Sequence, residues 1–373
     1  MKQVIAILLC LCVLLAGCGK QPEQTEPTTL PTAAPTTEPV PTTQPQEEPS
    51  TEATTEPATE PILLYCHPLT GEALEEPCTV RPTAVSINNY RAAQPVYGIS
   101  YADVIFEHIT EGLGTETRML AIFTDLDFDA KIGTVRSART YSISMASSMN
   151  AILVHCGGSK MANSKISSMK YPTLDQFYND KYFYRDQGRK ADGYASEHTL
   201  MTEGNLLQKG LNSKSWNLTV SEDAYYGFDF SDESLNGASA ESITIQYYNT
   251  SGKYTFMSYN KEDGMYYGLQ QWGKKQVPIA DANDNTSVGF KNVIVLKSKV
   301  THHEDGSHIY MTLTGEGDGF LARDGQYVPI KWTRATEADP FTFTLEDGTP
   351  VTLGVGKTYV SVLPTRSPEV IFE

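Results

Sequence analysis

Residues 137–155, SARTYSISMASSMNAILVH, determine the fold class expected for the first half of this chain. Residues 137–150 lack Pro and Gly and place Ile143, Ala146 and Met149 at helical spacing, so they predict a helix. The apolar run 151–155 then predicts a short buried strand. Three more strands are expected before this stretch, at residues 84–87, 103–106 and 119–123. Alternation of this kind favours a mixed α/β domain, which we assign to residues 62–235.

The second half of the chain has a different pattern. From about residue 241, apolar and polar residues alternate with period two in many short runs. Turn pairs separate several of these runs: Asp305-Gly306, Asp324-Gly325 and Asp347-Gly348. Asp-Gly between alternating runs is a strong hairpin signal. Residues 236–373 are therefore expected to form a mostly antiparallel all-β domain, and the whole chain an α+β fold.

The N-terminus has the pattern of a bacterial lipoprotein signal peptide over residues 1–17. Lys2 gives a positive start, residues 4–15 are apolar, and the small residues Ala16-Gly17 precede Cys18. About 12 apolar residues are too few to span a bilayer, which needs roughly 20 in a helix. We expect Cys18 to be lipidated (palmitate), anchoring an exported protein to the outer face of the bacterial cytoplasmic membrane. An ordinary secretory signal with a chance cysteine is the alternative.

Residues 18–61 are expected to be a disordered spacer. They consist mainly of Thr, Pro, Glu, Gln and Ala, with repeats such as Thr36-Thr37-Glu38-Pro39. Such a composition cannot bury a core. Frequent Pro favours polyproline II at about 3.1 Å per residue, so the segment could reach on the order of 100 Å.

Charge and cysteine content exclude several classes of protein. The chain carries a formal net charge of −16, which disfavours nucleic-acid partners. Three cysteines remain after Cys18, namely Cys66, Cys78 and Cys156, so at most one internal disulfide forms; the pairing cannot be read from the sequence. No CxxC motif or zinc-type Cys/His spacing is present. No cofactor and no metal are expected.

Several short motifs occur in an order that resembles the YerB-like lipoproteins, a two-domain family of unknown function. The most specific is Val135-Arg136-Ser137-Ala138-Arg139. The others are Pro68-Leu69-Thr70-Gly71, Arg81-Pro82-Thr83-Ala84-Val85, Ala102-Asp103-Val104-Ile105, Glu111-Gly112, Thr117-Arg118, His155-Cys156-Gly157-Gly158-Ser159, Phe183-Tyr184-Arg185-Asp186, Lys291-Asn292-Val293-Ile294-Val295 and Gly315-Glu316-Gly317-Asp318-Gly319. The resemblance implies an exported two-domain lipoprotein and no particular reaction.

Arg136-Ser137-Ala138-Arg139 is the best candidate for a binding site. Two arginines three residues apart would share a helical face at a helix N-terminus, where the dipole disfavours cations unless an anion lies between them. Arg118, Arg185 and Arg189 add further guanidinium groups, which suit phosphate or carboxylate. The alternative is an internal ion network with Glu107 and Glu111.

Residues 155–160 follow the predicted buried strand. Gly157, Gly158 and Ser159 could offer backbone N–H groups to an anion, but neither a P-loop nor a nucleophile elbow is present. A tight strand-to-loop turn is the alternative. His155, Glu197 and His198 are weak catalytic candidates, as acid–base groups.

Three further polar or Gly-rich stretches are interpreted as turns. Residues 281–285 lack the Gly and Glu of a calcium loop, and residues 302–305 lead into a hairpin tip. Residues 315–319 could cradle a phosphate, but Gly in a β context more often marks a turn or bulge.

Three classes of function are compatible with these patterns. The first is a non-catalytic binding or accessory lipoprotein that holds an anionic envelope ligand, such as a cell-wall glycan or polyprenyl phosphate. The second is a hydrolase or transferase acting on such a ligand. The third is an interaction module whose partner is a cell-wall assembly protein.

Overall fold

The computed structural model describes residues 65–373 except 112–115, 249–251, 304–305, 307 and 367–368. All the described residues belong to one compact unit. The expected signal peptide, Cys18 and the spacer lie outside the described residues. Within the part that is described, no helix is both long enough and apolar enough to cross a membrane.

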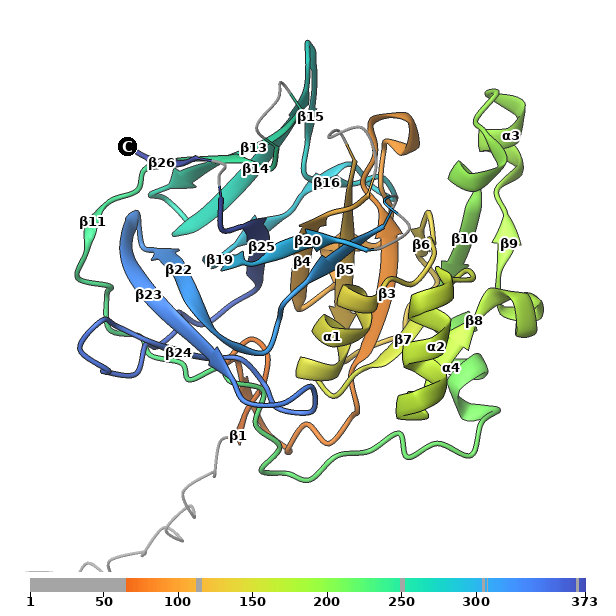
Figure 1. The fold of residues 1–373 in the computed structure, drawn as a ribbon, viewed down its shortest axis with the longest axis horizontal. Helices are drawn as coiled ribbons and strands as arrows, with labels where there is room; N and C mark the ends of the chain where they lie inside the picture. Colours follow the sequence, from red (N-terminus) through yellow and green to blue (C-terminus); the bar gives the residue numbers. More distant parts are fainter. Residues whose placement is uncertain (1–64, 112–115, 249–251, 304–305, 307, 367–368) are drawn as a thin grey trace, which may run out of the picture. The chain divides into compact units, whose positions relative to one another are not determined.

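An eleven-stranded sheet runs through the centre of this unit (Figure 1). In spatial order its strands are β11 (Ala238–Ser239), β23 (Gln326–Arg334), β22 (Gly315–Arg323), β19 (Asn292–Ser298), β25 (Thr358–Pro364), β4 (Val104–Ile109), β5 (Thr117–Phe123), β3 (Thr83–Asn88), β7 (Ile152–His155) and β8 (Thr173–Asp175), with β24 (Thr342–Thr344) paired to β23. The strands expected at 84–87, 103–106, 119–123 and 151–155 are confirmed as β3, β4, β5 and β7.

Strands from both halves of the chain pair within this sheet. β25 of the second half runs parallel to β4 of the first half and also parallel to β19. A single cluster of buried apolar side chains includes residues from both halves. The boundary predicted at 235/236 falls between the last helix and β11 and stays a prediction, since the packing continues across it.

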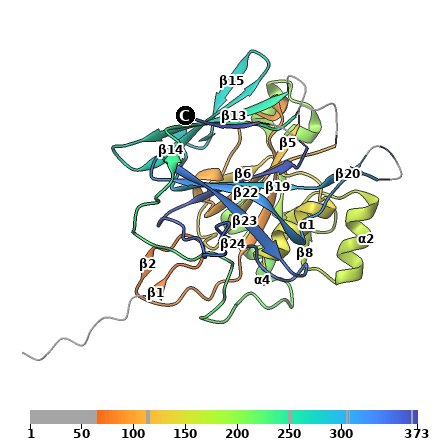
Figure 2. The same cartoon turned by 60° about the vertical axis from the view of Figure 1, so that its left-hand side comes forward.

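A six-stranded sheet lies at one side of the central sheet in both views of the ribbon (Figures 1 and 2). It contains β15 (Lys275–Pro278), β14 (Met265–Trp272), β13 (Lys253–Asn260), β12 (Ser242–Gln246) and β26 (Val370–Phe372), with β18 (Gly289–Phe290) on β14. The smaller sheets are β6 (Lys131–Gly133) with β10 (Leu200–Glu203) and β9 (Tyr184–Arg185), β1 (Tyr65–Cys66) with β2 (Ala73–Leu74), β16 (Ala280–Asp281) with β17 (Thr286–Ser287), and β20 (Val300–His302) with β21 (Ile309–Met311).

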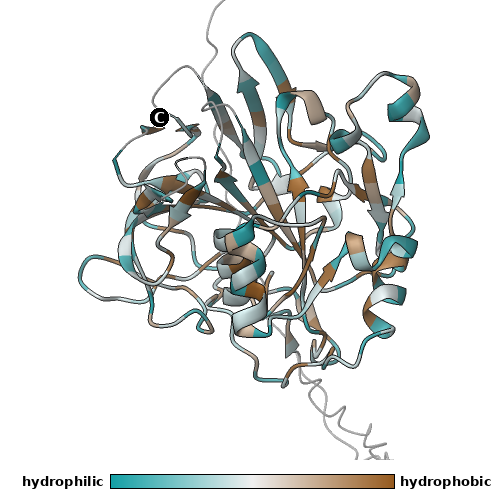
Figure 3. Ribbon diagram, turned by 45° about the vertical axis from the view of Figure 1, so that its right-hand side comes forward, coloured by the Kyte–Doolittle hydropathy of each residue, from teal (hydrophilic) through white to brown (hydrophobic). Residues whose placement is uncertain are grey.

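All described helices belong to the first half, so a mixed first half and an all-β second half are confirmed for the described residues. They are α1 (Thr140–Ser148), α2 (Lys160–Met169), α3 (Gln187–Ala191) and α4 (Gly204–Asn212), with 3₁₀ turns η1 (Arg91–Ala93), η2 (Ile99–Tyr101), η3 (Gln176–Tyr178), η4 (Asp180–Tyr182) and η5 (Ser196–His198). Every residue of α1 is buried, because α1 packs against β5, β7, β21 and α2. The apolar segments concentrate in the middle of the molecule (Figure 3).

The turn predictions are partly confirmed. Asp324-Gly325 joins β22 to β23, and residues 282–285 form the turn between β16 and β17. Residues 315–319, expected as a turn or bulge, instead begin the long strand β22. Here small residues are needed for packing, because Gly317 lies opposite Trp332 and a Cβ would come within 2.6 Å of the indole ring. The described cysteines Cys66, Cys78 and Cys156 are unpaired.

A fully buried ion pair connects the central sheet to the six-stranded sheet. Lys253 Nζ on β13 lies 2.7 Å from Glu107 Oε1 on β4, and both side chains are wholly buried. Glu107 also accepts hydrogen bonds from Thr117, Asn89, Thr255 and Tyr359. Burial alone would raise the pKa of the Glu107 carboxyl, but Lys253 and these hydroxyl donors hold it below its ordinary value.

Removing one partner of this pair leaves an uncompensated buried charge. We therefore expect Lys253→Met to lower the free energy of unfolding by about 3–5 kcal/mol. Urea denaturation of the 60–373 chain measures this loss. Adding Glu107→Gln to Lys253→Met should recover part of this loss, because an uncharged amide then replaces the unpaired buried carboxylate.

The exposed pair Lys261–Glu241 is the matched control, with side chains 69% and 58% exposed. Lys261→Met should change the unfolding free energy by no more than about 1 kcal/mol. Equal losses in Lys253→Met and Lys261→Met would contradict the role assigned to the buried pair.

Candidate functional site

The candidate site lies where several strands end at one edge of the central sheet. β3 and β7 run parallel, and β4 has the same direction because both β3 and β4 are antiparallel to β5. Their carboxyl ends therefore meet at one edge, together with the start of β5. Residues 135–138 cross this edge in extended form, held by bonds from Arg136 N to Ser86 O (2.8 Å) and from Ala138 N to Gly157 O (2.9 Å).

This geometry corrects one prediction. The helix expected from residue 137 begins at Thr140, so Arg136 and Arg139 do not share a helical face. Arg139 is the extended residue immediately before α1, and its backbone N–H donates to Ser142 Oγ (2.8 Å). Arg136 lies in the extended strand-like segment because its N–H and C=O bond to neighbouring strands instead of continuing a helix.

Arg118, Arg136 and Arg139 form a cluster at this edge. Arg118 is buried on β5, and its guanidinium donates to the carbonyl of Ser137 (2.7 Å). Burial and the neighbouring Arg139 guanidinium lower the pKa of Arg118 to about 10. Burial also lowers the pKa of Arg136, and the positive charge of Arg139 acts in the same direction. The three cations are thus close enough to oppose one another's charge.

Glu111 balances part of this charge. Its carboxylate accepts hydrogen bonds from Arg139 Nε and from the Tyr141 hydroxyl (2.9 Å), and lies 4.0 Å from His308 Nε2. Burial alone would raise the pKa of Glu111, but Arg139 and Tyr141 hold it below its ordinary value. Glu107, the other carboxylate proposed for an internal arginine network, pairs with Lys253 instead.

Arg136 differs from its two neighbours in having no hydrogen-bond partner for its side chain among the described residues. Its Nε is buried without a partner. Glu116 and Glu197 act on it electrostatically, but neither forms an ion pair with it. A buried N–H that lacks a partner costs free energy, so an acceptor from a ligand would be favourable here.

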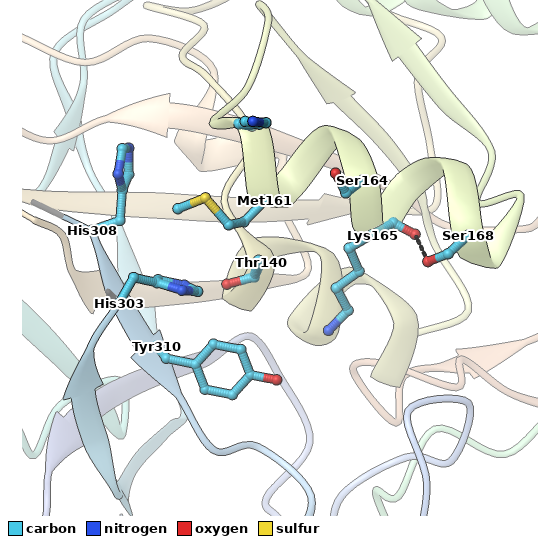
Figure 4. Close-up of a pocket in the computed structure, with 9 residues that line it drawn as sticks. Thr140, Met161, Ser164, Lys165, Ser168, His303, His308 and Tyr310 are labelled. Atoms are coloured by element: carbon cyan, nitrogen blue, oxygen red, sulfur yellow. Dashed lines mark hydrogen bonds between the residues drawn. The ribbon is translucent and has the colours of Figure 1, made fainter. Parts of the chain in front are cut away.

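A groove of about 780 Å³ is lined by Thr140, which follows Arg139, and by His308, which lies 4.0 Å from Glu111. Figure 4 shows this groove. His303, His308 and Tyr310 face Met161 and Lys165 of α2 across it. Thr140, the first residue of α1, lies between the two walls. Lys165 is already paired with Glu337 (2.9 Å), so the exposed Lys160 is the lysine of this groove that remains available to a ligand.

Glu197, His198 and Arg185 lie near Arg136. His198 is buried and its Nδ1 lies 3.0 Å from the Asn88 amide nitrogen at the end of β3. Glu197 is exposed, and the nearby Arg136 and Arg185 charges contribute to lowering its pKa, after its own backbone hydrogen bond. Arg185 donates to the carbonyl of Ser196 (2.5 Å).

Arg189 has a structural environment. Its buried guanidinium donates to the carbonyls of Ala93 (2.8 Å), His198 (3.0 Å) and Pro95. It also lies over the rings of Tyr97 and Tyr194. We therefore leave Arg189 out of the cluster.

Residues 155–159 form the strand-to-helix turn that the sequence suggested as an alternative. Gly157 has φ +62° and its N–H donates to Asp175 Oδ1 (2.8 Å). Ser159 caps α2 by accepting from Ala162 N (3.1 Å), and Gly158 bridges to Ala138. His155 is buried behind this turn, and burial lowers its pKa.

Sequence reasoning missed His108, Tyr141 and the groove residues His308 and Tyr310. His108 on β4 lies edge-on to Tyr141, with ring centroids 5.0 Å apart. No local motif marks these residues, because the fold alone brings them to the arginines. Within the described residues, no group of three or more His, Cys, Asp or Glu side chains is arranged to hold a metal ion.

Comparison with known proteins identifies the class of this chain. Residues 69–217 match the family "Protein of unknown function (DUF3048) N-terminal domain", and residues 243–360 match the corresponding C-terminal domain. The chain therefore belongs to the DUF3048 family, a two-domain family.

Among individual proteins, the chain is similar to the "Putative lipoprotein YerB" of Bacillus subtilis (strain 168). The two are 27% identical over 304 residues, which cover 80% of this chain and 86% of the relative. The crystal structure of the YerB protein from Bacillus subtilis matches with a TM-score of 0.71 and 23% identity, covering 82% of this chain and 99% of that one. The resemblance inferred from the short motifs is confirmed.

The buried His108 gives a test of the site's electrostatics. Burial lowers the pKa of His108 to about 4, whereas the unfolded chain takes up this proton near the ordinary value of 6.5. The folded state therefore loses stability as the pH falls from 6.5 towards 4, by about 1.4 kcal/mol per pH unit from this residue. Between pH 6.5 and pH 5, the free energy of unfolding of His108→Phe should fall by about 2 kcal/mol less than that of the wild type.

Urea denaturation at the two pH values measures this difference. The pKa values of His155 and His198 are also lowered in the folded state. Both residues are present in the wild type and in His108→Phe, so their contributions to the pH dependence cancel in the comparison. The exposed His302 provides the control, since His302→Gln should keep the wild-type profile. Parallel profiles for His108→Phe and wild type would contradict the assignment.

Proposed function

We propose that this chain is an exported, lipid-anchored protein of the bacterial envelope that binds an anionic group through Arg118, Arg136 and Arg139. The anchor is supported by the sequence pattern around Cys18 and by the relative named as a lipoprotein. The ligand would be a phosphate- or carboxylate-bearing envelope component, such as a wall glycan or polyprenyl phosphate.

The observation that carries the proposal is the unbalanced charge of the cluster. Three guanidinium groups lie close together in a chain of net charge −16, and Glu111 is the one carboxylate paired with them in the described residues. Clustering of partly buried cations is unfavourable unless an anion compensates them. The partnerless Nε of Arg136 supplies a donor for that anion.

The neighbouring groups support a binding role. The N-terminus of α1 adds a positive dipole end beside Arg139, and Thr140, the first residue of α1, lines the groove. Ser137, Gly157, Gly158 and Ser159 would shape the surrounding loops. Binding of an anion accounts for these features without a catalytic step.

Thermal unfolding of the 60–373 chain with and without sodium pyrophosphate tests the proposal. At about a hundred times the dissociation constant, the ligand should stabilise the fold by about 2.7 kcal/mol. We expect Arg136→Gln to abolish this stabilisation without unfolding the protein, because the Arg136 side chain makes no hydrogen bond with the described residues. The exposed Arg366 gives the matched control, Arg366→Gln.

Two outcomes would contradict the proposal. One is the absence of any stabilisation by pyrophosphate, by glycerol-phosphate polymers or by polyprenyl phosphate. The other is equal stabilisation of Arg136→Gln and the wild type at matched ionic strength, which would indicate nonspecific screening.

Glu111 allows a second test in the opposite direction. If its carboxylate occupies the place of a ligand's anionic group, Glu111→Gln should tighten pyrophosphate binding by about tenfold, since it frees Arg139 and removes a repulsion. Isothermal titration calorimetry measures the change. A loss of affinity in Glu111→Gln would show that this carboxylate positions the arginines for the ligand instead of competing with it.

A further inference from the structure

Two aromatic side chains protrude at the edge of the central sheet. Phe177 and Tyr178, on η3 directly after β8, are 69% and 87% exposed. They are the most exposed large hydrophobic side chains among the described residues. Adjacent exposed aromatic side chains with polar neighbours are candidates for a binding site.

The two rings flank a cavity of about 490 Å³ that is distinct from the groove beside the arginines. Its polar lining includes His155, Asn163, Asp175, Asn179 and Lys214. Amide, carboxylate and ammonium groups are therefore gathered next to two exposed rings. This combination offers hydrogen bonds on one side and an apolar surface on the other.

His155 forms part of the buried base of the cavity. The side chain is 1% exposed, and its Nδ1 lies 2.7 Å from the Gly157 carbonyl, to which it must donate. Its Nε2 is then the acceptor of a neutral imidazole, and this atom is buried without a hydrogen-bond partner among the described residues.

The walls of the cavity are held in place by Asp175. Its Oδ1 accepts from Gly157 N (2.8 Å) and from Phe177 N (3.2 Å), which fixes the aromatic turn against the strand-to-helix turn. Gly157 leaves room for the Phe177 ring, because a Cβ there would lie 2.5 Å from it. Phe177 is thus positioned before any ligand binds, which reduces the entropy cost of binding.

We propose that this cavity binds a sugar ring of a glycan. A pyranose has an apolar C–H face that can stack on Phe177 or Tyr178, and a rim of hydroxyl groups that can bond to Asn163 and Asp175. A protein partner fits less well, because an interface core is depleted in charged groups, whereas this lining contains Asp175 and Lys214. The proposal uses none of Arg118, Arg136 and Arg139, so it stands independently of the anion site.

Saturation-transfer NMR on the 60–373 chain tests this site, with N-acetylglucosamine tetrasaccharide and maltotetraose as probes. We expect saturation to be strongest on the C–H protons of one sugar face. Tyr178→Ala and Phe177→Ala should each weaken binding by about fivefold to tenfold, since each removes a stacking ring. Both substitutions should leave the fold intact because the rings are exposed. Tyr225→Ala, at an exposed tyrosine that does not line this cavity, is the control.

Asn163→Ala tests whether the polar lining of the cavity contributes to binding in addition to the two rings. It removes an exposed polar group of α2 that lines the cavity and should also weaken sugar binding. The proposal is overturned if neither sugar shows saturation transfer, or if binding is unchanged in Phe177→Ala and Tyr178→Ala. It is also overturned if the chain self-associates through these rings, so that Tyr178→Ala dissolves a dimer in sedimentation experiments. Arg136→Gln should leave sugar binding unchanged, so either proposal can fail alone.

Discussion

The buried ion pair between Glu107 and Lys253 is the constraint on which the arrangement of the two halves depends. Two opposite charges in a dry interior are tolerated only when they meet each other and their remaining bonds are satisfied. Here the hydroxyls of Thr117, Thr255 and Tyr359 complete the shell around Glu107. A shift of the six-stranded sheet against the central sheet would break the pair, so this contact specifies one packing of the halves.

The same strand that carries Glu107 also delivers Glu111 and His108 to the candidate site. β4 lies between β25 and β5, which holds its carboxyl end next to Arg118 at the start of β5. The pairing of β4 on both sides thus fixes the positions of these site residues. In such partly buried surroundings charges are screened less than in water, so three guanidinium groups and one carboxylate create a strong local field.

Local patterns in the sequence predicted the central strands, the helix and the Asp324-Gly325 hairpin, because those features depend on neighbouring residues. The start of α1 was predicted three residues early, since residues 136–138 bond to Ser86 and Gly157, which lie far away in the sequence. The arginines of the candidate site could be selected from their number in an acidic chain. The sequence could not tell whether Glu107 or Glu111 pairs with these arginines. The answer depends on Lys253 of the second half, which pairs with Glu107 and leaves Glu111 to Arg139. The sequence did not indicate Phe177 and Tyr178 as binding residues, since their exposure follows only from the folded structure.

Helix α2 lies between the two hollows described above, and this has a consequence for affinity. One of its faces contributes Met161 and Lys165 to the groove, and another contributes Asn163 and Ser167 to the cavity. A polymer that repeats sugar and phosphate along its length could occupy both hollows at once. The second contact would then be intramolecular, so two individually weak sites would combine into strong avidity for a long chain and little affinity for its fragments.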